Sequence, residues 1–336
     1  MTQPKTDEER EVTSGRTLGR KLLRHENAVL ALVLAILIAV MAVVTKGHTA
    51  SRTNAVNILL ESSIRGIASV GQAFVILSAG IDVSVGGMGL IASVVGASLM
   101  TNNPAWSIVA SPVPIGAVLP VMIIVAAAFG SANGALVSRV GVPPLIVTLG
   151  MWKICEGIGF QVSKGVSIAQ LPDAMEFFGF GRVGGVPVPV IIFITVAVIA
   201  YFVLNHTTFG KSLYAVGGNP TSAWLTGVSV NNITMVVYII SGGLAGLAGI
   251  VWTGRTMAAT MRSLTNLELD TIASVTIGGV SLAGGKGNVL GVVIGVIILG
   301  VINNGMSLMG ADPFLQNFVK GAIIIGAVAV DYLRRR

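Results

Sequence analysis

Charged residues are scarce in this chain. Only 10% of its 336 residues are Asp, Glu, Lys or Arg and 53% are hydrophobic, whereas a soluble domain carries roughly 25% charged residues. This balance excludes an ordinary soluble domain and indicates a polytopic membrane protein. The net charge of +7 does not indicate nucleic acid, because the basic residues gather at the two ends, in RTLGRKLLR and YLRRR. Such clusters beside apolar spans are typical of topology signals or of contacts with anionic lipid.

Cysteine and histidine are nearly absent. The single cysteine, Cys155, lies in an apolar segment, so we expect neither a disulfide framework within the chain nor a cysteine-rich metal site. The three histidines, His25, His48 and His206, flank apolar segments without the spacing of metal ligands or of a catalytic triad. We therefore expect no metal on this chain and no convergent set of catalytic residues.

A phosphate-binding loop is also missing. Gly210-Lys211-Ser212 resembles the last positions of that loop, but Asn205 stands where the motif needs its first glycine. We therefore expect that the chain is not an enzyme and does not bind ATP itself.

Long apolar runs are what the chain has in abundance. A membrane-spanning helix needs about 20 apolar residues, and cutting the chain at its glycine, proline and polar clusters leaves about ten segments of this kind. They are 28–45, 56–79, 86–101, 112–137, 143–162, 187–204, 233–253, 268–283, 287–304 and 313–333. The first is longer than the apolar part of a signal peptide and no clear cleavage site follows it, so we expect it to be retained.

An even number of spans puts both termini on one side of the membrane. If that side is the cytoplasm, the inner segments hold twelve of the 21 Lys and Arg residues and the outer segments hold six. This asymmetry agrees with the positive-inside rule, although two basic residues just after the first span oppose it locally. The predicted organisation is a cytoplasmic segment 1–27, one all-α transmembrane domain 28–333 with a cytoplasmic loop 205–232, and a basic tail 334–336.

Glycine, with 43 residues, has two predicted roles. The pairs Gly242/Gly246 and Gly291/Gly295 have the small-residue spacing that lets helix backbones approach closely. In GIDVSVGGMG (80–89) and GGVSLAGGKG (278–287) the glycines crowd together, which predicts breaks in the helices. Broken helices at membrane depth are tolerated where they line a cavity or are buried in protein.

Charges inside spans are costly and are therefore candidates for function. Glu61 and Arg65 lie four residues apart and Lys153 and Glu156 three apart, so each pair can neutralise itself on one helix face. Lys320 has no partner within a turn of its helix. It can snorkel, pair with another helix or contact a partner protein.

Three acidic residues have a predicted role at helix starts. Asp82, in the first glycine-rich break, can cap the next helix or face a water-filled path. Glu268 and Asp270 can begin a helix at the outer surface, where acids favour the N-terminal dipole. Docking of another protein on these two residues is the alternative.

The polar run NHTTFGKSLYAVGGNPTSAWLTGVSVNN (205–232) separates two apolar segments. Asn219 suits a helix N-cap, Pro220 the first helical position and Gly227 the position after the last turn. These signals predict a short helix over PTSAWLT. Its Trp224 and Leu225 are typical of an anchor for a groove in another protein, or, alternatively, of a helix lying among lipid headgroups.

Five motifs, in order along residues 56–332, resemble the permeases of ABC importers for ribose, xylose and arabinose, which are related to the branched-chain amino-acid permeases. The motifs are GQAFVILSAGIDVSVGG, ANGALVSRVGVPPLIVTLG, FGKSLYAVGGNPTSAWLTGVSV, ELDTIASVTIGGVSLAGGKGNVLGVVIGVIILGVINNG and FVKGAIII. The resemblance implies a non-catalytic permease subunit, in a bacterial or archaeal cytoplasmic membrane, that imports a monosaccharide.

The resemblance also implies partners and sites. The partners are a second permease copy or a paralogue, a separate ATPase that binds ATP and Mg²⁺, and a periplasmic or lipoprotein sugar-binding protein. The implied coupling helix, which inserts into a cleft of the ATPase, comprises Gly217, Gly218, Asn219, Pro220, Thr221, Ser222, Ala223, Trp224, Leu225, Thr226 and Gly227.

Polar residues within the spans are candidates for the sugar pathway, because a neutral, hydroxyl-rich solute suits a path lined by hydroxyl, amide and backbone groups. The candidates are Gln72, Asp82, Ser84, Asn133, Thr276, Asn303 and Asn304. For each of them except Asp82, hydrogen bonding between helices is the alternative. For the whole chain, the alternatives are a self-sufficient secondary transporter, or an ABC permease for an amino acid, a nucleoside or a furanone-like signal.

Overall fold

The computed structural model describes residues 26–333. The predicted tail 334–336 and the predicted segment 1–27, apart from its last two residues, lie outside this range. The regular secondary structure of the described residues is almost entirely helical, with α2 (Glu26–Val44), α3 (Arg52–Leu77), α4 (Val85–Met100), α5 (Ile115–Ala135), α6 (Pro144–Ser163), α7 (Glu176–Phe180), α8 (Val188–His206), α9 (Thr208–Gly218), α10 (Pro220–Leu225), α11 (Val230–Thr256), α12 (Leu267–Ile277), α13 (Val289–Leu308) and α14 (Pro313–Leu333). A π-helical turn, Leu136–Val140, extends α5, and a small hairpin pairs β1 (Arg182–Val183) with β2 (Val186–Pro187).

Within residues 26–333, six helical stretches are long and apolar enough to cross a membrane. They are α2, α5 with its π-turn, α6, α8, α11 and α13. The helices α4 and α14 are also apolar, but their apolar stretches are shorter. The chain is therefore an all-α polytopic membrane protein. The predicted segment 268–283 is wrong at its end, because α12 stops at Ile277 and a glycine-rich loop follows.

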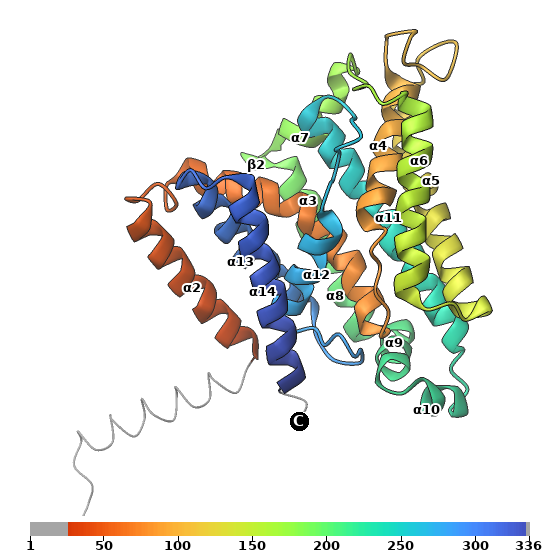
Figure 1. The fold of residues 1–336 in the computed structure, drawn as a ribbon, viewed down its shortest axis with the longest axis vertical. Helices are drawn as coiled ribbons and strands as arrows, with labels where there is room; N and C mark the ends of the chain where they lie inside the picture. The colour runs from red at the N-terminus through yellow and green to blue at the C-terminus, as the bar shows by residue number, and fades with distance from the viewer. Residues whose placement is uncertain (1–25, 334–336) are drawn as a thin grey trace, which may run out of the picture.

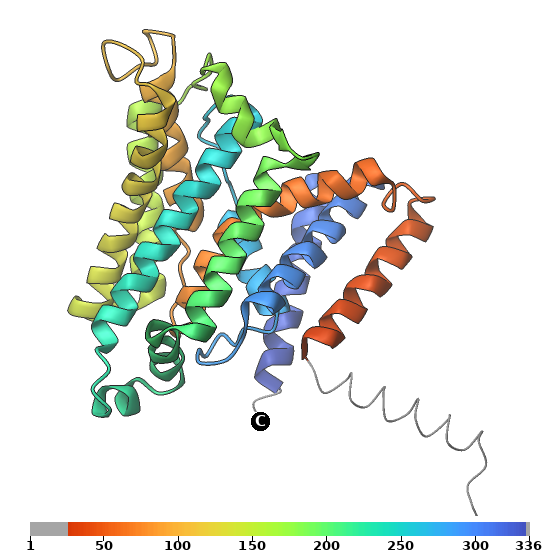
Figure 2. The ribbon, with the colours of Figure 1, turned by 180° about the vertical axis from the view of Figure 1, so that it is seen from behind.

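The helices are arranged around α3 and α11. Figure 1 shows α4, α5, α6 and α11 together on one side, and α2, α13 and α14 on the other, with α3 running between them. Seen from behind, α8 crosses α3 and leads down to α9 (Figure 2). The described ends of the chain lie at the same end of the molecule as α9 and α10 (Figure 1). The hairpin and α7 lie toward the opposite end.

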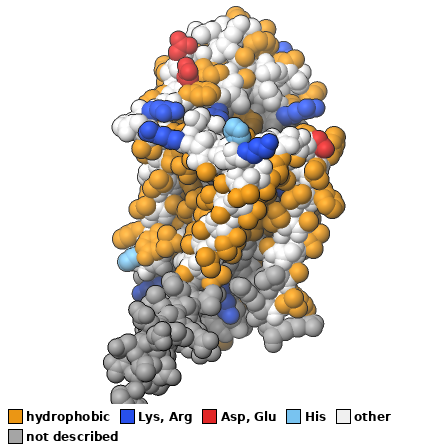
Figure 3. Space-filling model, turned by 90° about the vertical axis from the view of Figure 1, so that its left-hand side faces the viewer, with side chains coloured by type: hydrophobic (Ala, Val, Ile, Leu, Met, Phe, Trp, Pro, Cys, Tyr) orange, Lys and Arg blue, Asp and Glu red, His pale blue; other side chains and the backbone are white. Residues whose placement is uncertain are grey.

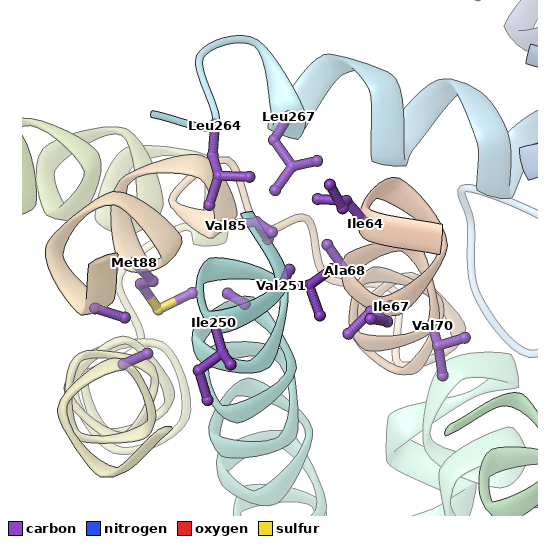
Figure 4. Close-up of a cluster of buried hydrophobic side chains, with 14 of the residues drawn as sticks. Ile64, Ile67, Ala68, Val70, Val85, Met88, Ile250, Val251, Leu264 and Leu267 are labelled. Carbon is purple, nitrogen blue, oxygen red and sulfur yellow. The ribbon is translucent and has the colours of Figure 1, made fainter. Parts of the chain in front are cut away.

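The core is formed where α3, α4 and α11 meet. Figure 4 shows Met88 of α4 on one side of α11 and Ile64 and Ile67 of α3 on the other, with Val251 of α11 between them and Leu264 above. All of these side chains are buried. The outer surface is apolar as well. Figure 3 shows hydrophobic side chains over the middle of one face and a band of Lys and Arg toward its upper end.

Close helix packing at the predicted glycine pairs is confirmed. A Cβ placed on Gly246 would lie 3.0 Å from the Cβ of Ala126 in α5, and Gly242 lies against the backbone of Ala126 and Gly130. On α13, Gly291 and Gly295 lie against the backbone of α12. These contacts leave no room for side chains, as the small-residue spacing requires.

Both predicted breaks are present, but the first is shifted. Residues 78–84 separate α3 from α4, and residues 278–288 separate α12 from α13. Gly86, Gly87 and Gly89 were predicted to interrupt the helix, whereas they lie inside α4. They are packing positions: a Cβ on Gly87 would lie 3.2 Å from the Cβ of Cys155 in α6.

Candidate functional site

The short helix predicted in the polar run is α10. The Asn219 side chain accepts a hydrogen bond from the Ser222 N–H at 2.9 Å, and Pro220 occupies the first helical position. Gly227 has a left-handed φ of 86°, which ends the helix as glycine does after a last turn. The side chains of Trp224 and Leu225 are 67% and 72% exposed, the arrangement expected of an anchor that another surface covers.

The preceding helix α9 was not predicted. Thr207 caps it by accepting from the Gly210 N–H at 3.2 Å, and Leu213 and Val216 bury one side of it. Three glycines in eleven residues hide the helical pattern in the sequence. The helix positions Gly217 on its buried side, whereas Gly218 is exposed.

The end of α9 touches the end of α3 and the second break through backbone atoms. A Cβ on Gly217 would overlap the Leu77 carbonyl at the end of α3 and lie 2.6 Å from the Gly285 nitrogen in the second break. The Gly285 N–H also donates to the Leu77 carbonyl at 2.9 Å. We call these three residues the glycine junction. It joins α9, the end of α3 just before the first break, and the second break through backbone atoms.

Tyr214 adds a side-chain contact beside the glycine junction. Its hydroxyl donates to the Gly287 carbonyl in the second break at 2.9 Å. Burial raises the pKa of Tyr214 above its ordinary value of 10.0, because the low-dielectric surroundings disfavour the phenolate. The segment 205–232 is thus attached to the transmembrane helices on one side and exposes α10 on the other.

Four of the candidate pathway residues form one buried cluster at the first break. The carboxylate of Asp82 accepts from the Ser84 N–H at 2.9 Å, from the Ser84 hydroxyl at 2.6 Å and from the Ser241 hydroxyl at 2.8 Å. The Asn133 amide donates to the Ser84 hydroxyl at 2.8 Å. In the orientation that satisfies both groups, the Gln72 amide bonds the backbone N–H and carbonyl of Asp82.

This cluster ties the first break to its neighbours. Asp82 is 0% exposed and bonds Ser84, the N-cap residue of α4, and Ser241. The predicted capping by Asp82 itself is not seen, because its carboxylate accepts from no N–H inside α4. Ser241 belongs to α11, Asn133 to α5 and Gln72 to α3. Its hydrogen bonds compensate a buried carboxylate that would otherwise be costly. In the described conformation the polar groups of this cluster therefore bond one another and do not line an open path.

The other three candidates lie apart from this cluster. The Thr276 hydroxyl bonds the Ile272 carbonyl of its own helix at 2.8 Å. Asn304 and Asn54 exchange two amide hydrogen bonds, at 2.7 and 3.0 Å, which joins α13 to α3. Asn303 is buried, and neither polar atom of its amide has a hydrogen-bond partner in the described residues. Both of its polar atoms are thus free to bond a solute or water, whereas in Asn133 only the amide oxygen lacks a partner among the described residues.

The charges of three helices meet at Asp270. Arg65 of α3 approaches its carboxylate at 3.1 Å and Lys320 of α14 at 3.0 Å. The predicted pairing of Arg65 with Glu61 is wrong, because Asp270 from α12 lies against Arg65 instead. Lys320 finds its partner on another helix, one of the three predicted alternatives. Glu268 and Asp270 lie in the first turn of α12, as predicted, and both are buried in the chain.

The predicted pair on α6 is confirmed. Lys153 Nζ lies 2.7 Å from Glu156 Oε2, and it also lies over the Trp152 ring at 4.1 Å from the centroid. Among the described residues no group of three or more His, Cys, Asp or Glu side chains is placed to hold a metal ion.

The sequence motifs match a known family. The family model described as branched-chain amino acid transport system / permease component matches residues 54–328. The ribose import permease protein RbsC of Escherichia coli (strain K12) is 36% identical over 325 residues, which is 95% of this chain and 97% of the relative. The D-allose transport system permease protein AlsC of the same strain is 39% identical over 302 residues, or 90% of each chain.

A third relative extends the range of sugars. The galactose/methyl galactoside import permease protein MglC of Escherichia coli (strain K12) is 37% identical over 295 residues, which is 84% of this chain and 88% of the relative. No solved structure matches the chain. The resemblance drawn from the sequence motifs is thus confirmed. The chain belongs to the family of branched-chain amino acid transport system permease components, and its relatives there include import permeases for ribose, allose and galactose.

Proposed function

We propose that the chain is the membrane-spanning subunit of an ATP-driven importer for a monosaccharide. The names of its relatives support the sugar, because three of them import different monosaccharides and all align along most of the chain. The structural observation that carries the proposal is the segment of α9 and α10. It exposes Trp224 on one side, and on the other the glycine junction joins it to the end of α3 and to the second break.

In this proposal α10 is the coupling helix and inserts into a cleft of a separate ATPase that binds ATP and Mg²⁺. Residues Gly217 to Gly227 then have two tasks. Trp224 and Leu225 fill the cleft, while Gly217 passes the movement to α3 and to the second break. ATP-driven closure of the ATPase would in this way change the position of the two breaks, and a second copy or a paralogue would complete the path.

The topology supports this arrangement. We propose ten spans, formed by α2, α3, α4, α5, α6, α8, α11, α12, α13 and α14. The described ends of α2 and α14 lie on the side of α10 (Figure 1). We propose that this side faces the cytoplasm of a bacterial or archaeal cell, as the basic residues near both ends of the sequence favour. The hairpin end then faces outward, toward a sugar-binding protein.

Under this proposal the candidate pathway residues fall into two groups with different roles. The cluster of Gln72, Asp82, Ser84 and Asn133 would open when the first break moves. Asn303, Asn304 and Thr276 would line or support the path beside α13 and α12. Glu268 and Asp270 are buried, so they cannot contact a sugar-binding protein directly. We propose that they instead support the outer loop 257–266, which leads into α12 and on which that protein would dock.

Reconstitution tests the proposal. The chain is placed in liposomes alone, and then together with the neighbouring ATPase and binding protein, and uptake of ribose, allose and galactose is measured with and without ATP. We expect uptake only from the complete system with ATP. Uptake by the lone chain would contradict the proposal and favour a self-sufficient transporter. ATP-driven uptake of amino acids or nucleosides, without sugar uptake, would contradict the sugar assignment.

A further inference from the structure

One charged pair, Lys153 and Glu156, lies near the middle of a helix that is long enough to cross the membrane, where a lipid-facing surface would carry no charge. Lys153 is the tenth and Glu156 the thirteenth of the 20 residues of α6. With a rise of about 1.5 Å per residue, Lys153 lies close to the middle of the helix, and about 13 Å from its start. The two side chains are nevertheless 63% and 41% exposed. Charges at this depth almost always face the bundle interior or a water-filled cavity.

The exposed face of α6 is a continuous stripe. Residues Ile146, Gly150, Lys153, Gly157 and Phe160 are all exposed and follow one another at spacings of four and three. The opposite stripe, with Cys155 and Gly159, is buried against α4. A Cβ on Gly150 or Gly157 would meet nothing within 4 Å. Lys153 thus stands between two open positions and has space around it for a small solute.

Lys153 does not escape toward a membrane surface. Its ammonium group turns to Glu156 at 2.7 Å and lies over the Trp152 ring, although a lysine near the end of a span snorkels to the interface. Since the pair stays at mid-depth, water or another chain must meet it there. In a pair of copies whose α6 helices face a shared two-fold axis, the two Lys153–Glu156 pairs would lie on opposite walls of the same interface.

We propose, resting on the proposed function, that Lys153 and Glu156 are a contact site for the sugar at the middle of the path between the two copies. The ammonium offers three donors and the carboxylate offers acceptors, the complement of a neutral, hydroxyl-rich solute. When no sugar is present the two groups satisfy each other. Binding is therefore weak, as passage through a membrane path requires.

Accessibility of the site is tested first. In a Cys155→Ala background of the full complex, Lys153→Cys is treated with a charged, membrane-impermeant thiol reagent. The matched control is Ile199→Cys, the twelfth of the 19 residues of α8, an exposed position on an apolar helix. We expect Lys153→Cys to react and sugar to slow the reaction, while Ile199→Cys stays unmodified. Equal lack of reaction at both positions would place Lys153 against lipid and overturn the proposal.

Transport then separates a sugar contact from a structural ion pair. We expect Lys153→Met and Glu156→Gln each to lower maximal sugar uptake about tenfold, a change of about 1.4 kcal/mol. Lys153→Arg should retain most uptake, and Lys164→Met, beyond the outer end of the helix, all of it. The double variant should stay impaired and change the ratio of pentose to hexose uptake. Recovery of uptake in the double variant would overturn the proposal.

The two levels of inference fail separately. If the complete wild-type system takes up no sugar, the proposed function is wrong. If it takes up sugar while Lys153→Met and Glu156→Gln behave like Lys164→Met, only the contact site is wrong.

Discussion

Substitution of Gly217 by alanine tests the glycine junction directly. A Cβ at this position would overlap the Leu77 carbonyl and lie 2.6 Å from the Gly285 nitrogen. Both are backbone atoms, which cannot rotate away as a side chain can. The adjacent Gly218 is a matched control in the same helix, because a Cβ there would meet nothing within 4 Å.

The expected cost follows from three contributions. Overpacking costs about 1–3 kcal/mol, and contact with rigid backbone places Gly217→Ala near the upper end of that range. Displacing Gly285 from Leu77 loses a hydrogen bond of 2.9 Å, which contributes about 1 kcal/mol. Alanine stabilises a helix by about 0.5–1 kcal/mol relative to glycine, which offsets part of this cost. The net loss is about 3 kcal/mol for Gly217→Ala, whereas Gly218→Ala is neutral or slightly stabilising.

Two assays measure the consequence. The free energy of unfolding of each variant is measured by denaturant titration in mixed micelles, and sugar taken up per ATP hydrolysed is measured in the complete importer. We expect Gly217→Ala to lose both stability and coupling, because α9 has to move away from the end of α3 and from the second break. Gly218→Ala should retain both. Equal values for the two variants would show that the junction neither supports the fold nor transmits movement.

Three further predictions concern the residues around the junction and the ion cluster. Trp224→Glu should abolish copurification with the ATPase and stimulated ATP hydrolysis, while Trp224→Phe preserves them; retention by both would exclude Trp224 as the anchor. Asp270→Asn leaves Arg65 and Lys320 without their carboxylate and should cost about 3–5 kcal/mol of unfolding free energy, whereas Lys320→Met should cost less, since Arg65 keeps its partner. Tyr214→Phe should cost about 1 kcal/mol for the lost hydrogen bond. Burial raises the pKa of Tyr214 in the folded state. The stability that this raised pKa contributes is therefore complete below pH 10 and falls as the pH rises above 10. In a pH series of unfolding measurements, Tyr214→Phe should reduce this loss of stability at high pH.

Features that depend on neighbouring residues were predictable from the sequence. The helix α10 is an example, because Asn219, Pro220 and Gly227 act within one or two turns of it. The packing role of Gly242 and Gly246 is another, since small-residue spacing lies along one helix. Apolar length was sufficient to place a helix in every predicted segment, although not to show that α12 ends at Ile277.

Features that depend on distant residues were not predictable. Arg65 was paired with Glu61 because the spacing rule considers one helix only, whereas its partner Asp270 lies more than two hundred residues away in the chain. The cluster around Asp82 combines the first break with three helices in the same way. No local signal showed that Gly217 meets Gly285, since a glycine in a helix looks the same whether it faces backbone or solvent.

The two breaks differ in what holds them, and this difference bears on how a movement of α9 would spread. A break lacks the repeating hydrogen bonds of a helix and therefore bends more easily than the helices beside it. The first break is held by Asp82, whose carboxylate accepts three hydrogen bonds from two serines. The second is joined to α9 and α3 by the Gly285 backbone and by Tyr214. Under the proposed coupling, the second break yields first, and the first break follows only when the bonds to Asp82 are exchanged.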